Sequence, residues 1–276
     1  MQIRAGYEIS YSCAQPTAMI AMLSVHPSRK SDLITPDLMR TDPAVPTKEY
    51  MDGFGNVCHV IHAPPGNITL SSDFTIQDEG SPDEVAPHAV QHSMENLPVD
   101  TLVYLLGSRY CETDRFIPFA WAKFGNHPKG WSLVKAICDY VHEHVQFGYE
   151  HANPMKTASQ AHNERRGVCR DFAHLAITLC RCMNIPARYC TGYLGDIGVP
   201  AAPEPMDFSA WFEVFLGDRW YTFDARHNVP RIGRILMARG RDATDVAIST
   251  SFGPCRLAGF KVVTDEVGAE VARTGF

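Results

Sequence analysis

The sequence lacks the features that would assign it at once to a membrane, nucleotide-binding or nucleic-acid-binding class. No window approaches the ~18 to 20 apolar residues that a membrane span requires. The first residues, MQIRAGYEISYSC, show no basic segment followed by an apolar run. Neither GxGxxG nor GxxxxGKS/T occurs, so nucleotide binding has no support. These absences predict a cytoplasmic protein that does not act on membranes.

The sequence also lacks local clusters of like charge. Lys+Arg total 25 and Asp+Glu total 31, which gives a net charge of −6, and no block of like charge stands out. Nucleic-acid binding is not expected, because phosphate recognition needs clustered cations. The 276 residues are 45% hydrophobic, enough to build one large domain or two modest ones.

The spacing of the cysteines and histidines predicts neither a disulfide framework nor a metal-binding site. The nine cysteines are odd in number and contain no CxxC pair, so we expect reduced thiols in a reducing compartment, most of them small core groups. His88 and His92 have helical spacing, and His59 and His62 lie near Cys58, but no further ligand completes either set. We therefore expect no metal and no cofactor.

The first part of the chain predicts an antiparallel β-sandwich over residues 1–85. Apolar and polar residues alternate with the period of a half-buried strand, and a Gly- and Asp-rich cluster within 49–61 predicts a hairpin tip. No segment there has helical periodicity, which favours two packed sheets. The predicted strands and hairpin are 2–13, 17–25, 49–61 and 67–76.

A polar, Pro-rich stretch then predicts a domain boundary, with a linker at 86–100. Beyond it, apolar residues at helical spacing predict helices over 131–145 and 169–183. Alternating segments predict strands over 187–193, 208–216 and 219–223. Residues 101–276 should therefore form an α+β domain, a helix packed on an antiparallel sheet, completed by the C-terminal tail.

Cys169 is the thiol whose surroundings suggest chemistry. It stands where a loop meets the predicted helix, so unpaired N–H groups and the helix dipole favour its thiolate. Arg165, Arg166 and Arg170 add positive potential, whereas Asp171 works against it. The structural alternative is a buried, inert cysteine.

Four blocks in order make the sequence similar to the transglutaminase-like cysteine enzyme superfamily. They are GVCRDFAHL (167–175), IPARYCTGY (185–193), AWFEVFL (210–216) and WYTFD (220–224). The N-terminal β region also resembles the region that precedes this domain in many bacterial members, so the likeness covers about residues 1–225. The resemblance implies a papain-like core in which Cys169 is the nucleophile and Asp224 orients the base.

The base itself does not carry over from the family. The family histidine directly precedes the AWFEV segment, and this sequence has Ser209 there. A hydroxyl cannot accept a thiol proton near neutral pH as imidazole does. Three interpretations stay open: His227 folds back into the space beside Ser209, Cys169 acts as a thiolate without a base, or the site binds a ligand without turnover.

Other residues near the blocks are candidates for the substrate side of the site. Ser209 and Trp211 are candidates for the cleft wall, and Asp207 and Glu213 share their strand parity, although a solvated strand face is the favoured interpretation for these two carboxylates. Gln160 or Asn163 would assist the Cys169 N–H at an oxyanion. The arginines within 231–241 are expected on a solvated face.

Together these residues predict a hydrolase that cleaves an amide or peptide bond through a Cys169 thioester. Hydrolysis is favoured over amine transfer, because bacterial members of the resembling family are commonly protease-like or amidase-like. The alternative is an impaired module that binds a peptide or small amide without turnover. The sequence identifies neither the substrate nor the oligomeric state.

Overall fold

The alternating strands at the start of the chain pair into two antiparallel sheets. The computed structural model of the chain describes residues 1–268. One sheet has the order β14-β1-β6-β3 and the other the order β13-β2-β5-β4. The strands of the first part are β1 (Gln2–Cys13), β2 (Thr17–Ala21), β3 (Arg40–Asp42), β4 (Thr47–Met51), β5 (Val57–Ala63) and β6 (Gly66–Gln77).

The core between these sheets comes from the alternation seen in the sequence. Ile3 and Ile9 of β1 and Leu70 of β6 are fully buried, whereas their neighbours along each strand are more exposed. Each buried residue pairs across the strands at a fixed register, for example Ile9 with Leu70. The period of two therefore predicted the buried face correctly.

The end of the chain returns to the first two sheets. β14 (Cys255–Glu266) pairs with β1, and β13 (Ser249–Phe252) pairs with β2. A disulfide joins Cys13 to Cys255. The expectation that all cysteines are reduced core thiols is therefore wrong for these two. The sequence had placed this tail with the helical domain, but the structure pairs it with the N-terminal strands; its last residues, 269–276, lie outside the described part.

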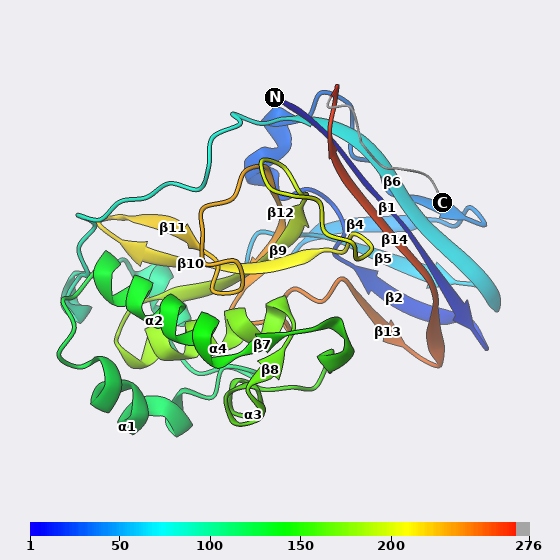
Figure 1. Ribbon diagram of the computed structural model, residues 1–276. Helices are drawn as coiled ribbons and strands as arrows, with labels where there is room; N and C mark the ends of the chain where they lie inside the picture. Colours follow the sequence, from blue (N-terminus) through cyan, green and yellow to red (C-terminus); the bar gives the residue numbers. More distant parts are fainter. Residues whose placement is uncertain (269–276) are drawn as a thin grey trace.

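The middle of the chain forms a helical half built on a third sheet of order β11-β10-β9-β12 (Figure 1). Helix α4 packs against β9 and β10 and is buried on nearly every side. The elements are α1 (Thr113–Phe124), α2 (Trp131–His144), β7 (Gln146–Phe147), α3 (Ala158–Glu164), β8 (Arg166–Gly167), α4 (Cys169–Cys182), β9 (Ala187–Leu194), β10 (Ser209–Leu216), β11 (Arg219–Phe223) and β12 (Arg234–Gly240). The predicted α+β class is confirmed.

The arginine-rich segment after residue 230 does not form a solvated face. It becomes β12, which pairs with β9 inside the third sheet. The Arg231 and Arg234 side chains are only 5% and 8% exposed. Asp83, from the stretch before the predicted linker, accepts hydrogen bonds from the Arg231 backbone N–H and from the Arg234 guanidinium. The polar residues before the linker therefore pack on the sheet.

Short 3-10 helices complete the connections. They are Pro27–Asp32, Met94–Asn96, Val99–Leu105 and Tyr149–His151. Among residues 1–268, every helix is too short or too polar to cross a bilayer.

Candidate active site

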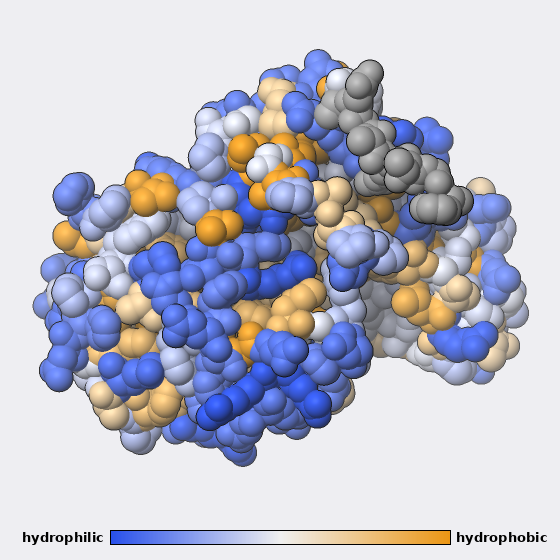
Figure 2. Space-filling view, in the orientation of Figure 1, coloured by the Kyte–Doolittle hydropathy of each residue, from blue (hydrophilic) through white to orange (hydrophobic). Residues whose placement is uncertain are grey.

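Four of the six residues expected at the site line one pocket of about 240 Å³: Cys169, Asp207, Ser209 and His227. The pocket walls are the start of α4, the loop before β10, the first residue of β10 and the loop after β11. In Figure 2, a depression separates the helical half from the two N-terminal sheets, and hydrophobic and hydrophilic residues are mixed over this face. Segments about 60 residues apart in the chain thus meet at one thiol.

Cys169 is held at the first position of α4 by a tightly packed turn. Asp171 accepts a hydrogen bond from the Val168 N–H at 2.9 Å, so its carboxylate caps the helix. A Cβ on Gly167 would lie 2.5 Å from the Asp171 Oδ2, which explains the glycine. The family block GVCRD therefore folds as a unit that places Cys169 at the pocket.

The surroundings of Cys169 favour the thiol over the thiolate. Burial raises its pKa to about 11, although the Arg226 guanidinium and the Ala210 backbone N–H partly offset this. Asp207 raises the pKa further by adding negative charge nearby. Burial therefore works against the resting thiolate that the helix start and its arginines were expected to favour.

Asp224 and His227 form a hydrogen-bonded pair at the opposite wall. His227 Nδ1 lies 2.8 Å from Asp224 Oδ2, and Asp224 Oδ1 also accepts the backbone N–H groups of Arg226 and His227. Burial alone would raise the Asp224 pKa, but Arg234 and the His227 hydrogen bond hold it well below its ordinary value. The ionised carboxylate can only accept, so Nδ1 carries a proton; in the neutral imidazole, Nε2 is then the acceptor.

Arg234 supports Asp224 from behind. Its Nη2 donates to Asp224 Oδ2 at 3.0 Å, and its Nε donates to Asp83. The guanidinium also lies 5.0 Å from the centre of the Trp211 ring. The aspartate therefore has one partner that faces the pocket and one that faces away.

Ser209 occupies the family histidine position with a side chain that makes no bond. It pairs with Gly192 at the start of β10 and is 5% exposed. Its hydroxyl oxygen is buried without a hydrogen-bond partner among the described residues. Its neighbour Ala210 donates to the Cys169 sulfur. Ser209 thus lines the pocket with a buried hydroxyl that has no partner among the described residues.

Asp207 and Arg226 place opposite charges in the same pocket without forming an ion pair. Asp207 accepts only the Phe208 N–H, and burial raises its pKa. Arg226 lies 3.8 Å from the centre of the Phe147 ring and has no carboxylate partner among residues 1–268. The sequence analysis did not select Arg226, since nothing in its spacing distinguishes it from other surface arginines.

The remaining candidates lie elsewhere. Trp211 does not line this pocket: it packs with Cys190 and Leu236 on the sheet face away from α4. Gln160 closes a capping box with Thr157, so its side chain is engaged at the start of α3. His174 is fully buried and stacks on Tyr110, away from the pocket as its helical position predicts.

The described residues contain no cluster of side chains that could bind a metal ion. Within 1–268, no group of three or more His, Cys, Asp and Glu side chains is arranged to hold an ion. Among the same residues, no hydrogen bond joins the Cys169 sulfur to His227, although both line the pocket. The polar groups that line the pocket include a thiol, an imidazole, carboxylates and guanidinium groups.

Similarity to known proteins covers both halves of the chain. The sequence pattern described as the transglutaminase-like superfamily matches residues 120–225. The crystal structure of a “Putative Cysteine Protease” from Cytophaga hutchinsonii superposes with a TM-score of 0.83 at 30% identity, covering 97% of this chain and 91% of that one. An uncharacterized protein of Mycobacterium leprae is 25% identical over 216 residues, 76% of this chain and 77% of that protein. An uncharacterized protein of Mycobacterium tuberculosis is 26% identical over 220 residues, 71% and 68% of the two chains.

Proposed function

Since the chain belongs to the transglutaminase-like superfamily, we propose that it is a cysteine hydrolase that cleaves an amide or peptide bond through a Cys169 thioester. One observation carries the proposal. The thiol and an imidazole already oriented by a buried carboxylate line the same pocket. A nucleophile, a base and a group that orients the base are the parts that acyl transfer through a thiol requires.

In the proposed first step, Cys169 attacks the substrate carbonyl as a thiol rather than as a preformed thiolate. The Sγ–H proton passes to His227 Nε2 while the sulfur–carbon bond forms and the carbonyl electrons move to oxygen. The Cys169 N–H, unpaired at the helix start, donates to that oxygen. His227 then gives the proton to the amine as the carbon–nitrogen bond breaks, which leaves the thioester.

In the second step, water replaces the amine. His227 removes a proton from the water as its oxygen attacks the thioester carbonyl, and the sulfur leaves and regains the proton. Asp224 stays ionised throughout, because its low pKa keeps it an acceptor that stabilises the imidazolium.

The proposal can be tested with an activated ester, which can acylate a reactive thiol although the natural substrate is unidentified. We expect p-nitrophenyl acetate to give a burst of p-nitrophenol and an acetyl group on Cys169, detected by mass spectrometry of the denatured protein. Cys169→Ala should abolish both signals, and His88→Ala, at an exposed histidine, should change neither. A burst that survives in Cys169→Ala would contradict the thioester mechanism.

A second candidate is a binding module without turnover. It is favoured by two observations: the Cys169 pKa near 11 and the absence of a hydrogen bond from its sulfur to His227 in the described residues. The two functions separate in a single-turnover assay with a fluorogenic peptide amide library. Release of product at a rate that depends on Cys169 supports the hydrolase, and saturable binding without release supports the module.

The cytoplasmic location stays a proposal that the Cys13–Cys255 disulfide weighs against. Structural disulfides persist mainly in oxidising compartments. A thiol titration of the denatured, unreduced protein addresses the bond directly. Seven reactive thiols would match the seven free cysteines, and nine would show that the bond does not form.

A further inference from the structure

A second cavity lies behind Asp224, on the face of the third sheet that points away from α4. Its volume is about 290 Å³. β10 and β12 form its floor, and the segments around Arg29 and Asp83 form its rim. Four arginines line it: Arg29, Arg231, Arg234 and Arg239. Three carboxylates, Asp78, Asp83 and Glu213, line it as well.

The carboxylates of this arginine cavity are already paired. Arg29 pairs with Asp78 at 3.2 Å, and Arg234 pairs with Asp83 at 3.0 Å. Glu213 pairs with Arg188, which reaches it from the neighbouring strand β9 at 2.5 Å. None of the three lining carboxylates is therefore left to balance a further cation.

Several guanidinium donors remain without an acceptor. Arg234 Nη1 and Arg231 Nε are buried and unpartnered among the described residues, in side chains that are more than nine-tenths buried. Arg239 forms no ion pair within residues 1–268. Burying a donor without an acceptor costs about 1–3 kcal/mol, more when the group is charged. Three arginines that line this cavity thus carry donors without an acceptor among the described residues.

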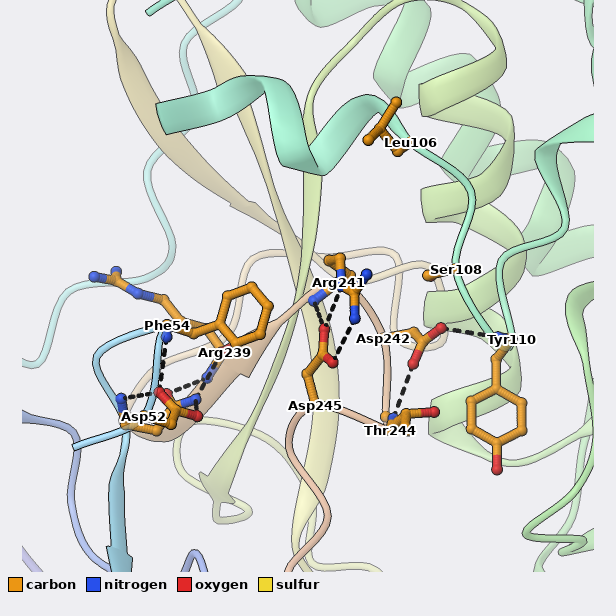
Figure 3. Close-up of polar contacts among 12 residues, drawn as sticks. Asp52, Phe54, Leu106, Ser108, Tyr110, Arg239, Arg241, Asp242, Thr244 and Asp245 are labelled. Carbon is orange, nitrogen blue, oxygen red and sulfur yellow. Dashed lines mark hydrogen bonds and ion pairs between the residues drawn. The ribbon is translucent and has the colours of Figure 1, made fainter. Parts of the chain in front are cut away.

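The backbone of Arg239 is fixed while its guanidinium is free. Asn56, fully buried at the β4–β5 turn, accepts from the Arg239 N–H and donates to the Arg239 carbonyl, both at 2.9 Å. Asp52 in turn holds the Asn56 side chain at 2.8 Å. Figure 3 shows the Arg239 guanidinium extended away from the other side chains drawn, without a contact to any of them. This backbone anchoring limits the entropy that Arg239 would lose on binding a ligand.

We propose that the arginine cavity binds a phosphate group, free or as a monoester. A phosphate dianion offers oxygens for several guanidinium forks at once, and Arg239 is a lining cation that forms no ion pair among residues 1–268, whereas Arg29, Arg231 and Arg234 each have a carboxylate partner. The proposal does not rest on the proposed hydrolase activity. It does connect to the same residues, because Arg234 bonds Asp224 through its other terminal nitrogen. A phosphate on Nη1 would hold Arg234, and through it Asp224, from the side away from the pocket.

The test is calorimetric titration of the full chain with inorganic phosphate and with O-phosphoserine, at constant ionic strength. Arg239→Gln should weaken binding about 10- to 100-fold, the loss expected for a charge-assisted hydrogen bond. Arg256→Gln is the matched control, since Arg256 lies on an exposed part of strand β14 outside the cavity. Binding by phosphoserine alone identifies the monoester as the ligand, and binding by both identifies the phosphate group itself.

Three outcomes would overturn the proposal. The first is no binding of either compound, and the second is equal binding by the wild type and Arg239→Gln. The third is tighter binding of acetate than of phosphate, which would assign the cavity to a carboxylate. Trp211 fluorescence gives a second readout, because its ring lies under Arg234 at the cavity floor. The far-ultraviolet circular dichroism of Arg239→Gln should match the wild type, since both Asn56 bonds to residue 239 use backbone atoms.

Discussion

The imidazole of His227 lies against the carboxylate of Asp224, with Nδ1 2.8 Å from Oδ2. The two residues are three positions apart, and the turn between them is closed by backbone N–H groups that donate to the same carboxylate. In the proposed function, this contact supplies the oriented imidazole that the family obtains from the strand position of Ser209. It makes His227 the first residue to test.

Replacing His227 with alanine should lower the rate of thioester formation about 10²- to 10⁴-fold, the usual contribution of a general base. Binding of the substrate should change little, because the pocket wall keeps its other groups. The measurement is the burst rate with p-nitrophenyl acetate, with His88→Ala as the exposed control. An unchanged rate in His227→Ala would leave Cys169 without a base and favour the binding module.

Alkylation of Cys169 by iodoacetamide should be slow at neutral pH and rise about tenfold for each pH unit toward its pKa of about 11. Arg226→Gln should slow the reaction at each pH, because it removes the cation that favours the thiolate. Peptide mapping isolates this thiol, since the other free cysteines in the described residues are buried. Arg109→Gln, at an exposed arginine, serves as control. Fast labelling below pH 8 would contradict the protonated resting thiol.

Restoring the family residue with Ser209→His should speed Cys169 alkylation near neutral pH, because an imidazolium beside the sulfur stabilises the thiolate. Ser209→Asn has a similar volume but no base, so it separates the effect of the imidazole from the cost of filling a buried position. The readout is the pH profile of alkylation for the two variants. Profiles that coincide would show that position 209 does not reach the thiol.

Arg234→Met should destabilise the protein by about 3–5 kcal/mol, because it leaves two carboxylates buried without their partner. Those carboxylates are Asp83 and Asp224. The control is Arg4→Gln, which breaks an ion pair with Asp73 whose side chains are 60% and 61% exposed and should cost at most about 1 kcal/mol. Urea unfolding of the three proteins gives the comparison. Equal costs for both variants would show that the Arg234 pairs contribute no more than a surface pair.

Acid should weaken the fold partly through His174. Burial lowers the pKa of this histidine to about 3 in the folded protein, against about 6.5 in the unfolded chain. The unfolded state then binds more protons, so stability falls as the pH drops from about 6.5 toward 3, by up to about 1.4 kcal/mol per pH unit.

His174→Gln should flatten this part of the profile, since glutamine does not titrate and keeps an acceptor for the Ala243 N–H. Urea unfolding at a series of pH values is the measurement. His88→Gln, at an exposed site, should keep the wild-type slope. A His174→Gln profile as steep as that of the wild type would assign the acid sensitivity to other groups.

Local pattern predicted the elements whose partners are near in sequence. Strands β1, β2, β6 and the β4–β5 hairpin follow alternation, and α2 and α4 follow helical periodicity within one residue, whereas β3, α1 and α3 were not predicted. Strands β12, β13 and β14 were not predicted, because their stability comes from β9, β2 and β1, which lie about 45 to 250 residues away. An arginine such as Arg234 is polar in sequence and becomes a buried residue only when Asp83 and Asp224 meet it.

The candidate site also has residues that the sequence predicted and features that only the fold determines. Cys169 and Asp224 follow from ordered blocks, and His227 from its distance of three residues from Asp224. Arg226 and the protonation of Cys169 depend on which charges lie across the pocket, and no spacing within the sequence encodes that. Strand parity also failed to place Trp211 correctly. Trp211 was expected to line the pocket with Ser209, but it packs against Cys190 and Leu236 instead.

Because β1 pairs with β14, the sheet that contains β1 can be completed only after β14 has been translated. β1 leaves the ribosome first, whereas β14 is translated about 250 residues later. Until then, one edge of the twelve-residue strand β1 offers unsatisfied backbone groups to any other nascent chain. Products of premature termination would keep that edge open, so they should self-associate even though their helical half is complete.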